Sequence, residues 1–165
     1  MSEDQPGLEQ PDPRIVRSGP GRFELRLPRA ERLLLRSLMP ELRELVEGRH
    51  PVTRRLFPIA YHDDPDKERE YQSLMGSELA AGRLAAIGTV EETLNEPAVD
   101  LAGLERWMEA INSLRLVLGT RLEVDEDLPV LEPGDPDASA YAVYEYLGWL
   151  MEQAVQAMSA DLAQG

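Results

Sequence analysis

The segment from about Pro136 to Leu162 constrains the fold most, because apolar residues recur along it at helical spacing in two separate stripes. One stripe comprises Tyr141, Tyr144, Gly148, Met151, Val155, Met158 and Leu162, and the other comprises Val143, Leu147, Leu150, Ala154 and Ala157. A helix that is apolar on two sides is usually buried on two sides. We therefore expect either the central helix of a bundle or a helix with one stripe facing a second copy of the chain.

Three upstream segments show the same period and carry helix start and stop signals. Pro28 suits the first position of a helix and Gly48 suits its end, while Pro40 between them predicts a kink or two short helices. The apolar stripe expected there is Ala30, Leu33, Leu34, Leu38, Leu42, Leu45 and Val46. Asp64 and Asp100 are expected to cap the next two helices.

Other residues in these helices allow two interpretations each. Gly76, Gly82 and Gly88 either weaken their helix or permit close helix packing. Trp107 and Trp149 lie on apolar helices, which favours core packing, although Trp is also a common interface anchor.

The N-terminal region is not helical in pattern. Residues 1–13 are acidic and rich in proline, which predicts a disordered tail. Gly19-Pro20-Gly21 separates two short runs, and Phe23, Leu25 and Leu27 alternate with polar residues, which predicts a β-hairpin over residues 14–27. The expected fold is mainly α: a single domain over residues 14–165, with this hairpin and a helical bundle of four to five helices over residues 28–165.

Composition limits the possible chemistry and location. The chain has 165 residues and no cysteine, which excludes disulfides, zinc-thiolate sites and thiol catalysis by these residues. No apolar run approaches the roughly 18 residues that a membrane span needs. The first residues do not resemble a signal peptide. We expect a cytoplasmic protein that does not enter a membrane.

Charge is distributed unevenly along the chain. Residues 14–55 hold 11 Arg against 5 Glu, whereas residues 56–165 hold 6 basic and 22 acidic residues, and the net charge is -14. The basic region could meet an acidic partner or a phosphate backbone, or it could be ordinary solvated charge. The negative total argues against sequence-independent DNA binding.

Motifs for catalysis, cofactors or metals are absent from the sequence. His50 and His62 are the only imidazoles, and no pattern for a nucleophile or a phosphate-binding loop accompanies them. The acidic run beside His62 is interpreted as helix capping rather than as a metal site. Asp125 to Asp127 is interpreted as a solvated loop, because it lacks the ligand spacing of a calcium loop. We expect no enzyme activity, cofactor or metal.

Several remaining residues are candidates for interaction. Asn112, Arg115 and Arg121 lie along or just beyond one helix and could bind a small anion or a carboxylate of a partner. Tyr144, Trp149 and Met151 are the candidates on the last helix if one of its stripes is an interface.

These residues carry a resemblance to a known family. The segments concerned are Leu56 to Tyr61, Glu70-Tyr71, Trp107, Ala110 to Leu122, Val143-Tyr144 and Leu147 to Leu150. They resemble an actinobacterial family of unknown function that includes the oxidative-stress regulator AosR. The resemblance spans nearly the whole chain after the tail, and the run from Asn112 to Arg121 is its most specific part.

The resemblance implies a cytoplasmic regulatory protein. The named member of the family is described as acting with an alternative sigma factor on cysteine biosynthesis genes and as sensing oxidants through a CxxxC pair. Because this sequence has no cysteine, that switch is not expected here.

Three functions are therefore compared. The first is a homodimeric regulator that contacts a transcription protein, for example a sigma factor. The second is a small-ligand protein or enzyme that uses Asn112, Arg115 and Arg121, with His62 as a further candidate. The third is direct DNA binding through the basic hairpin and first helix, which the net charge disfavours.

Overall fold

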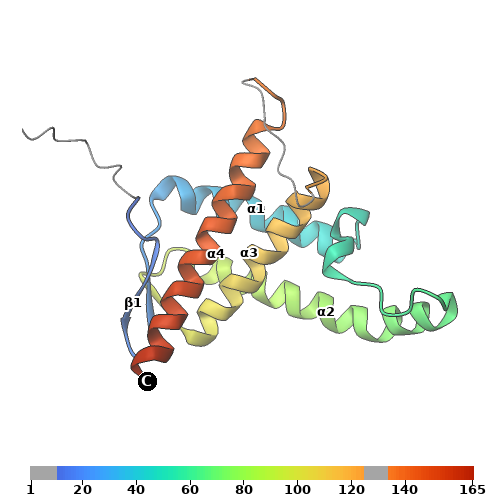
Figure 1. The fold of residues 1–165 in the computed structure, drawn as a ribbon, viewed down its shortest axis with the longest axis horizontal. Coiled ribbons are helices and arrows are strands. Elements are labelled where there is room, and N and C mark those ends of the chain that lie inside the picture. Colours follow the sequence, from blue (N-terminus) through green and yellow to red (C-terminus); the bar gives the residue numbers. More distant parts are fainter. Residues whose placement is uncertain (1–10, 125–133) are drawn as a thin grey trace, which may run out of the picture.

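The computed structural model describes residues 11–124 and 134–165. In chain order these residues form β1 (Ile15–Gly19), β2 (Arg22–Leu25), α1 (Arg29–Glu47), the 3-10 helix η1 (Pro51–Leu56), α2 (Pro65–Thr93), β3 (Ala98–Asp100), α3 (Leu101–Arg121) and α4 (Ala138–Gln164) (Figure 1). The predicted mainly α fold with an N-terminal hairpin is confirmed. Most of the predicted tail and all of the Asp125 to Asp127 run lie outside the described residues. No helix in the described ranges has the length and apolar character needed to cross a membrane.

The hairpin is the edge of a small antiparallel sheet with the order β1-β2-β3. Phe23 pairs with Val99, so the hairpin joins the segment that leads into α3. Phe23, Leu25 and Leu27 are all buried, as their alternation predicts. The third strand was not predicted, because a strand of three residues is too short for a periodic pattern.

Helix α1 runs unbroken through Pro40, so of the two predicted alternatives, a kink or two short helices, the second is wrong. Proline removes the hydrogen bond to the carbonyl of Arg36, but Arg36 and Pro40 both face solvent, where water can replace the lost donor. The buried face of α1 also differs from the predicted stripe. It consists of Leu35, Met39, Leu42 and Val46, whereas Leu33 is 50% exposed.

Helix α2 begins at the predicted cap, where the Asp64 carboxylate accepts a hydrogen bond from the amide of Lys67 at 3.2 Å. The C-terminal part of α2 packs in the bundle through Ala86, Ile87 and Val90. Its N-terminal part, together with the segment before it, extends away from the other helices (Figure 1). We call residues 57–76 the arm.

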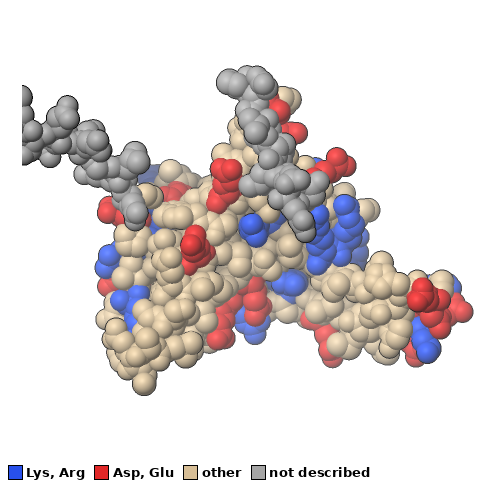
Figure 2. Space-filling model, in the orientation of Figure 1, with Lys and Arg blue, Asp and Glu red and all other residues tan. Residues whose placement is uncertain are grey.

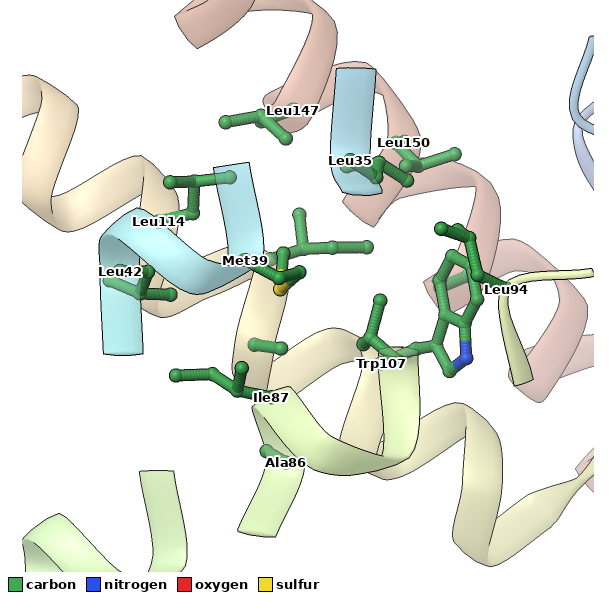
Figure 3. Packing of buried hydrophobic residues seen from close by; sticks show 14 of the residues in the cluster. Leu35, Met39, Leu42, Ala86, Ile87, Leu94, Trp107, Leu114, Leu147 and Leu150 are labelled. Atoms are coloured by element: carbon green, nitrogen blue, oxygen red, sulfur yellow. The ribbon is translucent and has the colours of Figure 1, made fainter. Parts of the chain in front are cut away.

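The central helix of the bundle is α3, which packs against α2, α4 and η1. Trp107 is fully buried, and its indole Nε1 donates a hydrogen bond to the hydroxyl of Thr93 at 2.7 Å, which confirms that this Trp is a core residue. Figure 3 shows Trp107 in one cluster with Leu35, Met39, Ile87, Leu147 and other buried side chains. Helix α4 buries one of its stripes fully in this core, namely Leu147, Leu150, Ala154 and Ala157. From the other stripe, Met151 and Met158 pack against the core as partly buried side chains.

Candidate interaction surface

The second apolar stripe of α4 remains partly open to solvent. Met151 and Met158 are half-buried, whereas Val155 is 47% and Leu162 is 80% exposed. These residues follow one another at helical spacing, so they form a continuous strip on one face of α4. An exposed apolar strip of this kind is typical of a protein interaction site.

A cationic and aromatic group lies at one end of this strip. The Arg115 guanidinium from α3 lies 4.7 Å from the centroid of the Tyr144 ring. Gly148 makes this approach possible, because a Cβ at that position would lie 3.3 Å from Arg115 Nε. Arg115 Nε is buried there and has no hydrogen-bond partner within the described residues. The guanidinium is therefore held in place by packing, without a carboxylate partner in the described ranges.

The two other polar candidates on α3 do not share one location. Asn112 is half-buried and lies on the same face as Arg115, three residues earlier. Arg121 is exposed and borders a different hollow of about 290 Å³ between α1 and α3, beside Leu38 and Leu45. Asn112 and Arg115 thus share one face of α3, whereas Arg121 borders another hollow, so the three residues do not line one pocket.

Trp149 lies in a different environment from Tyr144 and Met151. The Arg14 guanidinium lies over the Trp149 ring, 5.3 Å from its centroid. The centroids of the Trp149 and Tyr146 rings are 6.2 Å apart. Arg14 also pairs with Glu31 of α1 at 2.9 Å. Burial, reinforced by the neighbouring Glu31, raises the pKa of the Tyr146 hydroxyl far above its usual value, so this phenol stays neutral. This group joins the hairpin to α1 and α4.

An arginine-rich end of the bundle was not singled out from the sequence. Arg49, Arg54, Arg55 and Arg121 lie where α1 ends, η1 follows and α3 ends. We call them the arginine cluster; within the described part of the chain, none of them forms an ion pair. Figure 2 shows basic side chains gathered where the arm leaves the body. The adjacent Arg54 and Arg55 were the sequence signal that could have indicated this cluster.

The histidines and carboxylates show no metal-binding arrangement in the described ranges. No group of three or more His, Asp or Glu side chains there is placed to hold a metal ion. His50 Nδ1 instead accepts a hydrogen bond from the amide of Val52 at 3.0 Å, which caps η1. The capping role predicted for Asp64 is confirmed.

Comparisons with known proteins find one matching family profile and several similar proteins. The family profile described as Domain of unknown function (DUF2017) matches residues 13–158. The "Putative oxidative stress regulator AosR" of Mycobacterium leprae is 32% identical over 129 residues, which is 67% of this chain and 59% of that relative. The "Oxidative stress regulator AosR" of Mycobacterium tuberculosis H37Rv is 30% identical over 123 residues, or 64% of this chain and 56% of the relative. The chain thus spans less than two thirds of these relatives, and no solved structure matches it.

Proposed function

Since the chain belongs to the DUF2017 family, we propose that it is a non-enzymatic regulator that acts by binding another protein in the cytoplasm. Its curated relatives are named as oxidative stress regulators. Regulators without a catalytic site commonly act through contact surfaces. The proposal therefore depends on a surface of this chain that is suited to a protein partner.

The open strip of α4 is the observation that carries the proposal. It presents Met151, Val155 and Leu162 along one face of α4, with the Tyr144 ring and the Arg115 guanidinium at its N-terminal end. Met, Tyr and Arg are enriched in the centres of protein interfaces, where they provide apolar area with a polar or charged end. Because Arg115 has no carboxylate partner among the described residues, a carboxylate on the bound protein would complete its interactions.

We assign the partner to the transcription machinery, with a sigma factor as the first candidate. The relatives are named as oxidative stress regulators, which supports a regulatory contact, and the choice of a transcription protein is our proposal. The chain has no cysteine, so its own residues cannot switch this contact by thiol oxidation.

Site-specific photocrosslinking tests this proposal directly. A photoreactive residue at Val155 should crosslink to one member of a panel of purified actinobacterial sigma factors, and the Val155→Asp variant should lose binding to that member. A photoreactive residue at the exposed Glu105 of α3 is the matched control and should give no crosslink. If no sigma factor or RNA polymerase subunit binds, or if binding survives both Val155→Asp and Leu162→Asp, the proposal fails.

A further inference from the structure

The arm exposes a concentration of apolar side chains that the bundle does not cover. Ile59, Tyr61, Leu74 and Met75 are all exposed, and Leu74 is 67% accessible. Three of them, Tyr61, Leu74 and Met75, line a hollow of about 350 Å³ together with Lys67, Glu70 and Tyr71. The arm therefore carries a projecting apolar side chain directly beside a recess of matching character.

Internal contacts hold the arm in a defined shape. The backbone amides of Ala60 and Tyr61 each donate a hydrogen bond to Glu68 Oε2, at 3.0 and 2.7 Å. These two bonds fix the loop that precedes α2 against that helix. The Tyr61 ring meets the Tyr71 ring edge-on at 6.0 Å. The pKa of the Glu68 carboxyl is lowered by the hydrogen bond from Gln72 and by those backbone amides, so this tie persists into mild acid.

The base of the arm is fixed to the arginine cluster. Arg49 lies over the Phe57 ring at 4.2 Å. Its guanidinium also lies against Gly76, where a Cβ would come within 2.7 Å of Nη1. The apolar surface is thus presented on a stiff support, which limits the entropy lost when a partner binds.

Charge is divided between the two ends of the arm. The tip carries Asp63, Asp64 and Asp66, with Lys67 and Arg69 on the next turn, and both acidic and basic side chains are visible there in Figure 2. Asp66 pairs with Arg69 at 2.6 Å, whereas Asp63 and Asp64 form no ion pair among the described residues, so the tip stays net negative. The base meets Arg49, Arg54 and Arg55. From Pro65 to Gly76 the helix rises about 17 Å, at 1.5 Å per residue. One elongated surface therefore has a negative end, an apolar middle and a positive end.

We propose that the arms of two copies of this chain cross antiparallel and form a homodimer. A two-fold axis near Tyr71 would place Leu74 of each copy in the hollow of the other. The same operation would bring the acidic tip of each arm to the arginine cluster at the base of the other arm.

The arm carries both sides of each proposed contact, which favours a second copy of the chain over a different protein as its binding partner. In an isologous interface every contact occurs twice, so a single surface must carry both members of each contact. The arm has both the projecting Leu74 and its recess, and both the acidic tip and the basic base. This inference goes beyond the proposed function, since the regulator could bind its partner through α4 with or without a dimer.

Light scattering at several protein concentrations is the first test. The wild type should show the mass of two chains, and the dimer should weaken as salt rises, because charge pairs at its ends are screened. Leu74→Lys should raise the dissociation constant by about tenfold or more, as loss of a central apolar anchor does. Leu162→Lys on α4 is the matched control and should leave the dimer intact.

Charge reversal gives a second, independent test that does not depend on one apolar residue. Asp63→Arg with Asp66→Arg reverses the charge of the tip, and Arg54→Asp with Arg121→Asp reverses the charge of the arginine cluster. Each variant alone should be monomeric, whereas a mixture of the two should form a heterodimer.

The outcomes separate this proposal from the contact proposed for α4. A wild-type monomer at all concentrations overturns the homodimer. A dimer that survives Leu74→Lys, or that is lost in Leu162→Lys, overturns the arm as its interface. Crosslinking from Val155 to a sigma factor reports on the α4 contact and should be retained in Leu74→Lys.

Discussion

Arg115 and Tyr144 form a stacked pair across α3 and α4, with the guanidinium 4.7 Å from the ring centroid and against Gly148. Within the described residues the pair has no carboxylate partner, and Arg115 Nε is buried without a hydrogen bond. A buried donor without a partner reduces stability. Such costs are often found at functional sites, where a side chain serves a partner rather than the fold.

Arg115→Met should therefore separate stability from binding. The substitution keeps an unbranched apolar stem against Tyr144 and removes the unsatisfied donor. We expect the free energy of unfolding in urea to stay equal or rise by about 1 kcal/mol. Binding to the sigma factor identified by crosslinking should weaken at the same time. If the unfolding free energy falls by more than about 2 kcal/mol, Arg115 is a structural residue.

Thr93→Val should destabilise the core despite its similar shape. Thr93 accepts the hydrogen bond from Trp107 Nε1 at 2.7 Å, and Trp107 is fully buried. Removing the acceptor leaves a buried indole N–H without a partner, which costs about 1–3 kcal/mol. Thr89→Val is the control, since among the described residues the Thr89 hydroxyl donates one hydrogen bond, to the carbonyl of Ala85. Urea unfolding should distinguish the two variants; equal values would contradict the role of the Trp107 contact.

The helix starts could be predicted from sequence because capping is local. Asp64 and Asp100 each accept a hydrogen bond from an amide three residues later, and the sequence pattern alone predicts both positions. The face that each helix buries depends on its neighbours, which the sequence does not show. Leu33 and Leu35 of α1 are equally apolar, yet only Leu35 is buried.

The interaction surfaces were harder to predict for the same reason. Tyr71 and Met75 lie on the apolar stripe of α2, and nothing in the periodicity shows that the helix leaves the bundle before Gly76. Arg115 and Arg121 are close in sequence but lie on different faces of α3. Tyr144 and Met151 were identified from the doubly apolar pattern of the last helix, and their contact with a partner is a prediction that the crosslinking from Val155 tests.

The glycines of α2 should respond differently to substitution by alanine. Gly82 and Gly88 have no atom within 4 Å of the position that a Cβ would take. Gly82→Ala and Gly88→Ala should each stabilise the protein by about 0.5–1 kcal/mol, because alanine loses less backbone entropy in a helix. Gly76→Ala should give no such gain, since its Cβ would displace Arg49 from Phe57. Thermal unfolding of the three variants tests this; an equal gain in all three would contradict the Arg49 contact.

Asp161 should make the attachment of the hairpin to α4 sensitive to acid. Its Oδ1 accepts hydrogen bonds from Arg17 Nε at 2.7 Å and from the amide of Gly21 at 3.0 Å. The Arg17 hydrogen bond, followed by that from Gly21, holds the pKa of the Asp161 carboxyl below its usual value. When the pKa of a carboxyl is lower in the folded state than in the unfolded state, its ionised form stabilises the fold. This stabilisation is complete at pH values above the pKa of the unfolded state, and it is lost as the pH falls through the pKa of the folded state.

Asp161→Asn should therefore lower the urea midpoint near neutral pH, and the difference from wild type should shrink below the usual range of an aspartate. Glu152→Gln is the matched control on α4, because Glu152 is exposed and forms no ion pair within the described residues. The urea midpoint of Glu152→Gln should equal that of the wild type at every pH. A difference between Asp161→Asn and wild type that stays constant into acid would show that the Asp161 charge does not hold the hairpin.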